Sequence, residues 1–270
     1  MQSITNTHRS RSRVALAVLV SIGVAPRLVQ AQDDRAGSAS PAEVTAQRSA
    51  AFGAFSTWTM TARTDMQHAV VRAMGGYDGA NQGARFESSA EAQIVQRVAL
   101  RAGASTSPAT EGLGLRFEGK WDALRQEANG VDLAVAGGYE QHGFNEVSAA
   151  VGTVAVGRRL GRLQLLGNLG YARGIAQTEE HYGSAGLAAM YRVAESLQFG
   201  LDSRFRIDLE RDDDEPPGER EWELEAGPTV TLTAGSFALT GGTGLVANRL
   251  RLVPGTDVGA LGYVGVGAAF

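Results

Sequence analysis

The chain has 270 residues, of which 35 are glycine, about 13% against a usual ~7%. It has no cysteine, and 20% of its residues are charged while 43% are hydrophobic. This composition excludes disulfides, thiolate metal sites, a lipid-modified N-terminal cysteine and a cysteine nucleophile. It is also too apolar for a disordered chain.

The first 31 residues have the layout of a secretory signal. Three arginines between residues 9 and 13 precede an apolar run over 14–25, and small residues end the segment at Ala31. The run is too short for a bilayer core of ~30 Å, which takes ~20 residues to cross. We therefore expect 1–31 to be a cleaved signal peptide. Its loss removes four arginines and no acid from 25 basic and 29 acidic residues, which leaves a net charge of −8 and disfavours nucleic-acid binding.

Residues 32–65 are expected to form an N-terminal periplasmic linker or short helix. The segment opens with small and polar residues, and 42–55 is compatible with a helix that Ser40 caps and Pro41 begins. An N-terminal plug or periplasmic extension is the alternative to a solvated tail.

From residue 66 to the end, hydropathy alternates with a period of two. The clearest case is 197–209, where Leu201 and Phe205 belong to an apolar series and Asp202 and Arg204 to a charged one. Such a pattern predicts strands with one apolar and one polar face. Counted from the C-terminus, the predicted strands are 257–270, 236–247, 222–233, 196–208, 183–193, 161–173, 145–157, 130–140, 111–121, 92–102, 82–89 and 66–75.

The connections between these strands alternate in length. Short turns are expected at 88–90, 158–161, 194–196 and 234–236, and longer polar loops at 104–110, 141–145, 174–182, 208–221 and 248–257. The segment 122–129 is longer than the short turn that the alternation of connections predicts there. An even number of strands, with short turns at one end, indicates an up-and-down antiparallel barrel. We predict an all-β transmembrane barrel of about 12 strands, with 10 to 14 possible, over residues 66–270.

The direction of the two faces separates a membrane barrel from a secreted sandwich. A sandwich packs its apolar face inward, whereas a membrane barrel turns it toward lipid and lines its lumen with polar residues. Alternation that continues over thirteen residues and the presence of opposite charges on the polar face both favour the barrel. The expected lumen charges are Arg97, Arg101, Arg116, Glu118, Arg162, Asp202, Arg204, Arg206, Asp208, Glu223 and Glu225.

The signal segment, the alternating strands and the last strand resemble the outer-membrane β-barrel proteins of double-membraned, Gram-negative bacteria. That strand carries small or apolar residues at every second position and ends in Phe270. The resemblance implies that Phe270 is an assembly signal for the barrel-assembly machinery and that the protein resides in the outer membrane. Interfacial aromatic residues are expected at Trp58, Trp121, Trp222, Tyr139, Tyr171, Tyr191 and Tyr263.

Chemical motifs are sparse. His142 and His181 lie near carboxylates in expected outer loops, so they are the candidates for a hydrolytic site at the rim, with ordinary solvated loop residues as the alternative. The acidic run over 210–221 lacks the spacing of a calcium loop and fits a solvated loop. A glycine-rich stretch over 241–244 has no following helix to bind phosphate. No cofactor and no metal are expected.

The sequence therefore predicts an outer-membrane barrel that is a narrow pore or a structural membrane protein. An outer-membrane hydrolase and a surface adhesion protein that uses its long loops are the alternatives. The expected partners are outer-membrane lipid and, during biogenesis, the assembly machinery. The oligomeric state stays open.

Overall fold

A computed structural model describes residues 69–107, 110–142, 148–175, 181–209, 220–250 and 254–270. The predicted segments 1–31 and 32–65, with the helix at 42–55, lie outside these ranges. The strands are β1 (Ala69–Asp78), β2 (Gly83–Val95), β3 (Val98–Ser107), β4 (Thr110–Leu124), β5 (Asp132–His142), β6 (Ser148–Leu160), β7 (Leu163–Gly174), β8 (His181–Ala194), β9 (Leu197–Asp208), β10 (Arg220–Ala234), β11 (Phe237–Leu250) and β12 (Asp257–Ala269).

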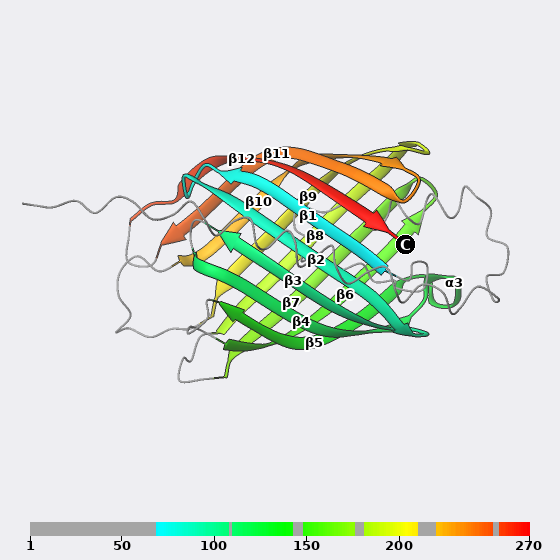
Figure 1. Ribbon diagram of the computed structural model, residues 1–270. Helices are drawn as coiled ribbons and strands as arrows, with labels where there is room; N and C mark the ends of the chain where they lie inside the picture. The colour runs from blue at the N-terminus through cyan, green and yellow to red at the C-terminus, as the bar shows by residue number, and fades with distance from the viewer. Residues whose placement is uncertain (1–68, 108–109, 143–147, 176–180, 210–219, 251–253) are drawn as a thin grey trace, which may run out of the picture.

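These strands form one closed antiparallel barrel (Figure 1). Each strand pairs with its neighbours in sequence, and β1 closes the ring by pairing with β12 from Val70 opposite Ala269 to Asp78 opposite Leu261. Phe270 continues this seam, because its backbone N–H donates to the carbonyl of Ala69 at 2.9 Å. The prediction of a barrel of about twelve strands is confirmed, and the alternative of a two-sheet sandwich is wrong.

Most strand ends differ from the sequence prediction by a few residues, and one predicted turn is misplaced. The turn expected at 88–90 is absent, because Ser88 and Ser89 lie inside β2 and pair with both β1 and β3. The turn instead falls at Gln96 and Arg97, where Arg97 adopts a φ of 69°. Two adjacent serines are typical of a turn when only the local sequence is considered. Here the backbone hydrogen-bonding groups of both serines pair with the strands on either side.

The long segment at 122–129 folds as the end of β4 followed by the one-turn helix α3 (Gln126–Asn129), which Gly130 terminates in a left-handed conformation with φ 77°. In Figure 1, α3 and the C-terminus lie at the same end of the barrel. This is also the end of the two-residue turns at 96–97, 161–162, 195–196 and 235–236. Among the described residues, no helix is long and apolar enough to cross a bilayer.

Apolar side chains face outward and ionised ones inward. Along β9, Leu201 is 65% exposed and the adjacent Asp202 is 3% exposed. The other strands repeat this alternation, with Leu169, Leu187 and Val264 all at least 60% exposed. The predicted direction of the faces is therefore confirmed on these strands.

Tyr263 departs from its expected outward position. It is 5% exposed and lies inside the barrel beside Met74 and Leu261. Its cross-strand partner is Gly242, and a Cβ there would lie 2.4 Å from the Tyr263 hydroxyl. A glycine on β11 thus makes room for the tyrosine ring. Of the other predicted aromatic residues, Trp121, Tyr139, Tyr171 and Tyr191 are exposed, Trp222 is half-buried and Trp58 lies outside the described residues.

Candidate functional site

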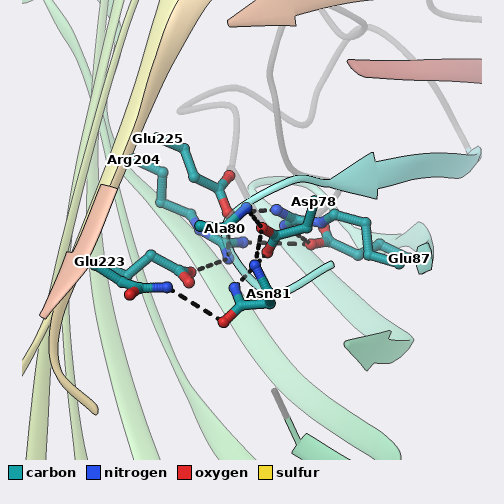
Figure 2. Close-up of polar contacts among 9 residues, drawn as sticks. Asp78, Ala80, Asn81, Glu87, Arg204, Glu223 and Glu225 are labelled. Atoms are coloured by element: carbon teal, nitrogen blue, oxygen red, sulfur yellow. Dashed lines mark hydrogen bonds and ion pairs between the residues drawn. The ribbon is translucent and has the colours of Figure 1, made fainter. Parts of the chain in front are cut away.

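A network of ion pairs connects β2 with β9 and β10 inside the lumen. Arg85 donates to Glu225 through Nη1, and its Nη2 lies 2.6 Å from Oε1 of Glu87. Arg204 lies 3.3 Å from Glu87, 3.5 Å from Glu225 and 3.7 Å from Glu223. Figure 2 shows Arg204, Glu223 and Glu225 approaching Glu87 from the facing wall. The five side chains form the central network.

This network spans the lumen. Around the ring, β2 and β9 are separated by β1, β12, β11 and β10. A circular barrel of twelve strands, spaced ~4.8 Å apart and tilted ~40°, has a radius of ~12 Å and would hold these two strands ~23 Å apart. An extended arginine and an extended glutamate in contact link Cα atoms at most ~16 Å apart. The wall is therefore flattened here, and the central network divides the lumen.

A second network connects inward-facing side chains of β3, β4, β5 and β8. Arg116 lies 2.6 Å from Glu118 on its own strand and 3.3 Å from Glu140 on β5. Glu118 also accepts from Arg101 of β3 at 3.4 Å. The Tyr182 hydroxyl reaches across from β8 and donates to Glu140 at 2.6 Å. These charges must be paired because little water reaches them, since Glu118 and Arg101 are 3% and 4% exposed.

The second network extends toward both neighbouring walls. On one side, the guanidinium carbon of Arg206 on β9 lies 3.9 Å from the centre of the Tyr182 ring, a cation–π geometry. On the other side, Lys120 of β4 reaches past β3 to Glu91 of β2 at 2.8 Å. The second network therefore joins side chains of β2 to β5 with those of β8 and β9.

The β1–β2 turn bends into the lumen at the end opposite α3. Asp78 is 2% exposed and accepts from the backbone N–H groups of Ala80 at 3.1 Å and Asn81 at 3.0 Å. The Asn81 side chain accepts from Asn248 of β11 at 3.2 Å, so the turn crosses over β12. A Cβ on Gly259 of β12 would lie 2.1 Å from the Ala80 nitrogen. The absence of a side chain at Gly259 is what lets the turn lie there.

At the opposite end, the β4–β5 connection reaches over β5. The Gln126 side chain donates to the Arg159 carbonyl and accepts from the Arg159 N–H, both at 2.7 Å. Asp132 holds the start of α3 by accepting from the Gln126 backbone at 2.8 Å. Both ends of the described lumen thus carry a segment held by specific hydrogen bonds.

Nine of the eleven predicted lumen charges occupy inward-facing strand positions. Arg101, Glu118, Asp202, Glu223 and Glu225 are buried, and Arg116, Arg204, Arg206 and Asp208 are half-buried. Arg97 and Arg162 instead lie in exposed two-residue turns, because the strands before them run further than the sequence pattern indicated.

Sequence reasoning missed Arg85, Glu87, Glu91 and Tyr182 as network members, whereas Lys120 lies on the polar face that the alternation of 111–121 predicted. Arg85, Glu87 and Glu91 are separated by even numbers of residues and so share the inward face of β2, which is the signal that would have identified them. The misplaced turn at 88–90 cut that strand in two and concealed the alternation.

Of the two histidine candidates for a rim site, only His181 has a described side chain. His181 stands at the start of β8, where its Nδ1 lies 2.9 Å from the Tyr171 hydroxyl and its ring stacks on that tyrosine with 6.1 Å between centroids. His142 ends β5 and its side chain lies outside the described residues. The central parts of the expected long loops also lie outside them, so a role in adhesion stays a prediction. No group of three or more His, Cys, Asp or Glu suited to a metal occurs in the described ranges.

No protein-family model matches the chain, and no curated protein matches it. Among solved structures, it is similar to a KdgM porin in complex with disordered oligogalacturonate, at 7% identity and a TM-score of 0.48, over 74% of this chain and 99% of that one. It is also similar to the outer membrane protein OmpT of Vibrio cholerae, at 9% identity and 0.40, over 75% and 98%. A third similar structure is the outer membrane protein Omp33 of Acinetobacter baumannii, at 9% and 0.42, over 76% and 98%. The fold is established by the closed ring of strands itself.

Proposed function

We propose that the protein is a bacterial outer-membrane β-barrel that forms a narrow pore with a preference for cations. The single observation that carries the membrane location is the continuous apolar exterior around a closed ring of strands, with Leu169 and Leu187 both 67% exposed. In water such a surface would associate, whereas acyl chains solvate it. The signal segment at 1–31 supports export across the inner membrane.

The charge of the lumen supports the preference for cations. Of the ionisable side chains that are buried in the described residues, nine are acidic and three are basic. The half-buried side chains of the described residues add seven arginines and three carboxylates, which reduces the acidic excess without reversing it. A lumen lined by carboxylates attracts cations and repels anions.

The central network supports a restricted rather than a wide pore. It joins facing walls through Arg85 and Arg204, and its members Glu87 and Glu225 are 4% and 1% exposed. A permeating ion has to pass beside these contacts or displace them. The same burial favours a second candidate function, a closed structural barrel without conductance.

Conductance in planar bilayers distinguishes the two candidates. We expect the purified wild type to give small unitary conductance steps. In a KCl gradient, its reversal potential should lie on the side of the K⁺ equilibrium potential. The Arg85→Gln/Arg204→Gln variant should show larger steps and stronger cation preference, because it removes two cations from the central network.

The matched control is Arg97→Gln/Arg162→Gln, which removes two arginines from exposed turns and should conduct as the wild type does. Folding of each variant is checked by its migration in gel electrophoresis with and without boiling. A reversal potential set by Cl⁻ would contradict the proposed preference. An absence of steps in both the wild type and the lumen variant, with both folded, would favour the structural barrel.

A further inference from the structure

A tyrosine, an arginine and a histidine share the outer surface of the barrel at the end opposite the short turns. Tyr171 and Arg173 lie on β7, and His181 begins β8. Alternation turns all three outward, since Leu169 of β7 and Leu187 of β8 lie an even number of residues away and are both 67% exposed. The register agrees, because Arg173 stands directly opposite His181. Tyr171, Arg173 and His181 form the β7–β8 cluster.

Two of these side chains are held together. The Tyr171 hydroxyl lies 2.9 Å from Nδ1 of His181, and the two rings stack with 6.1 Å between centroids. The cross-strand partners of Tyr171 are Gly152 and Gly183, and neither carries a side chain that would occupy the space beside its ring. When the hydroxyl donates to Nδ1, the other ring nitrogen, Nε2, carries the proton. The fixed imidazole then offers a hydrogen-bond donor on the outer surface.

Arg173 adds a positive charge without a counter-charge. It is exposed, and no described carboxylate forms an ion pair with it. Residues directly opposite each other in an antiparallel pair have Cβ atoms about 4.5–5.5 Å apart, so its guanidinium and the imidazole of His181 can contact the same ligand. Arg249 shows the contrast. It lies on the outer face of β11 at the same end of the barrel, and its Nε is 3.1 Å from a carboxylate oxygen of Glu221.

The β7–β8 cluster lies at the edge of the apolar exterior. Arg173 follows Leu163, the first residue of β7, by ten positions. With a rise of ~3.3 Å per residue and a tilt of ~40°, this separation corresponds to ~25 Å along the barrel axis, the full height of the lipid-facing band. Tyr171, which is 49% exposed, belongs to the residue type that collects at membrane interfaces. The guanidinium and the imidazole are therefore at the depth of lipid headgroups.

We propose that the β7–β8 cluster binds the phosphate group of an anionic lipid in the outer leaflet. The inference rests on the membrane location proposed above, with the short turns facing the periplasm. Charge selects the ligand, because phosphate is the anionic group that an arginine without a counter-charge meets at headgroup depth. A guanidinium donates two parallel hydrogen bonds to phosphate oxygens, and Nε2 of His181 supplies a third. Tyr171 is a positioning residue that acts through His181.

The test uses the folded barrel in micelles of a zwitterionic detergent. The barrel is titrated separately with lipid A, which carries phosphate monoesters, with phosphatidylcholine and with inorganic phosphate, and the bound ligand is counted by native mass spectrometry. EDTA is present throughout, so that no divalent ion links phosphate to carboxylates such as Glu179 and Glu180, which precede His181 in the sequence. We expect lipid A to bind more tightly than the other two ligands.

Three variants test the assigned roles. One arginine at an anionic lipid surface is worth about a fivefold gain in binding, so Arg173→Gln should bind lipid A about fivefold more weakly. His181→Phe keeps a ring that can stack but removes both nitrogens, and the lost hydrogen bond should weaken binding by about the same factor. Tyr171→Phe should weaken it less, because it removes only the hydroxyl that positions His181.

The matched control is Arg249→Gln, which removes the same charge from the same end of the outer surface, where Glu221 already neutralises it. It should retain wild-type affinity. Equal losses in Arg173→Gln and Arg249→Gln, or no loss in either, would overturn the site. Inorganic phosphate that binds as tightly as lipid A would overturn the lipid as its ligand. Insertion into lipid vesicles is measured in parallel: a barrel that inserts normally but does not prefer lipid A refutes the site alone, whereas failure to insert refutes the membrane location.

Discussion

The pair of Arg85 and Glu225 allows the dryness of the lumen to be measured. Their side chains are 7% and 1% exposed. Removing one partner of a buried pair costs about 3–5 kcal/mol of unfolding free energy, because it leaves a charge without its counter-ion. Arg204 stays 3.5 Å from Glu225, so we expect the lower end, about 3 kcal/mol, for Arg85→Gln and for Glu225→Gln. The double variant removes both charges and should lose little more than either single one, a coupling of about 2 kcal/mol.

The assay is equilibrium unfolding by urea of the barrel folded in lipid vesicles, followed by tryptophan fluorescence. The chain supplies its own control in Arg249 and Glu221, whose ion pair of 3.1 Å has side chains 52% and 39% exposed. The same cycle of glutamine substitutions there should give a coupling of about 1 kcal/mol or less. A coupling for Arg85 and Glu225 as small as that of the control would mean that water hydrates the central network, and the argument for a constricted lumen would fail.

Three further predictions concern the turn, the exterior and the C-terminus. Gly259→Val should expel the β1–β2 turn from the lumen and raise conductance, because its Cβ would lie 2.1 Å from the Ala80 nitrogen. The control Gly262→Val, where nothing lies within 4 Å of the added Cβ, should leave both the turn and the conductance unchanged. Equal conductance of the two variants would contradict the turn's role. Leu201→Arg, on the exterior in the middle of β9, should lower the free energy of unfolding in vesicles by about 2–4 kcal/mol. Leu209→Arg, beyond the end of the strand, should lower it by at most about 1 kcal/mol. Equal losses for the two variants would show that lipid does not cover the middle of the strand. Phe270→Ser should reduce assembled barrel in cells, judged by heat-dependent migration, while the purified chain still folds in detergent; unchanged assembly in cells would refute its role as a signal.

The strand arrangement was readable from the sequence because each strand obeys one local rule. Alternation along 197–209 identified β9 to within one residue, since a strand with an apolar exterior on one face and charged neighbours on the other must separate its apolar and polar residues. Short turns then fixed the order of the strands. The rule failed at Ser88 and Ser89, where small polar residues mimic a turn although the ladder continues through them.

The site could be predicted only in part. Alternation shows that Arg204 and Glu225 face inward, but it contains no information on which inward residue from a distant strand meets them. The contact of Arg85 with Glu225 depends on flattening of the barrel, and the position of the β1–β2 turn depends on the missing side chain of Gly259. Both are properties of the closed ring and not of any single strand.

Cysteine labelling along β9 tests the central arrangement most directly, because the chain contains no cysteine of its own. Single cysteines are placed at each position from 198 to 207 and labelled with a nitroxide in the unfolded chain, because a thiol among acyl chains stays protonated and would not react; the barrel is then folded into vesicles. We expect fast nitroxide relaxation by oxygen, which dissolves in the acyl chains, at Phe199, Leu201 and Phe205, and slow relaxation at Gln198, Asp202 and Arg204. Uniform relaxation, or faster relaxation of the second set than of the first, would contradict a barrel with its apolar face in lipid and its charges enclosed.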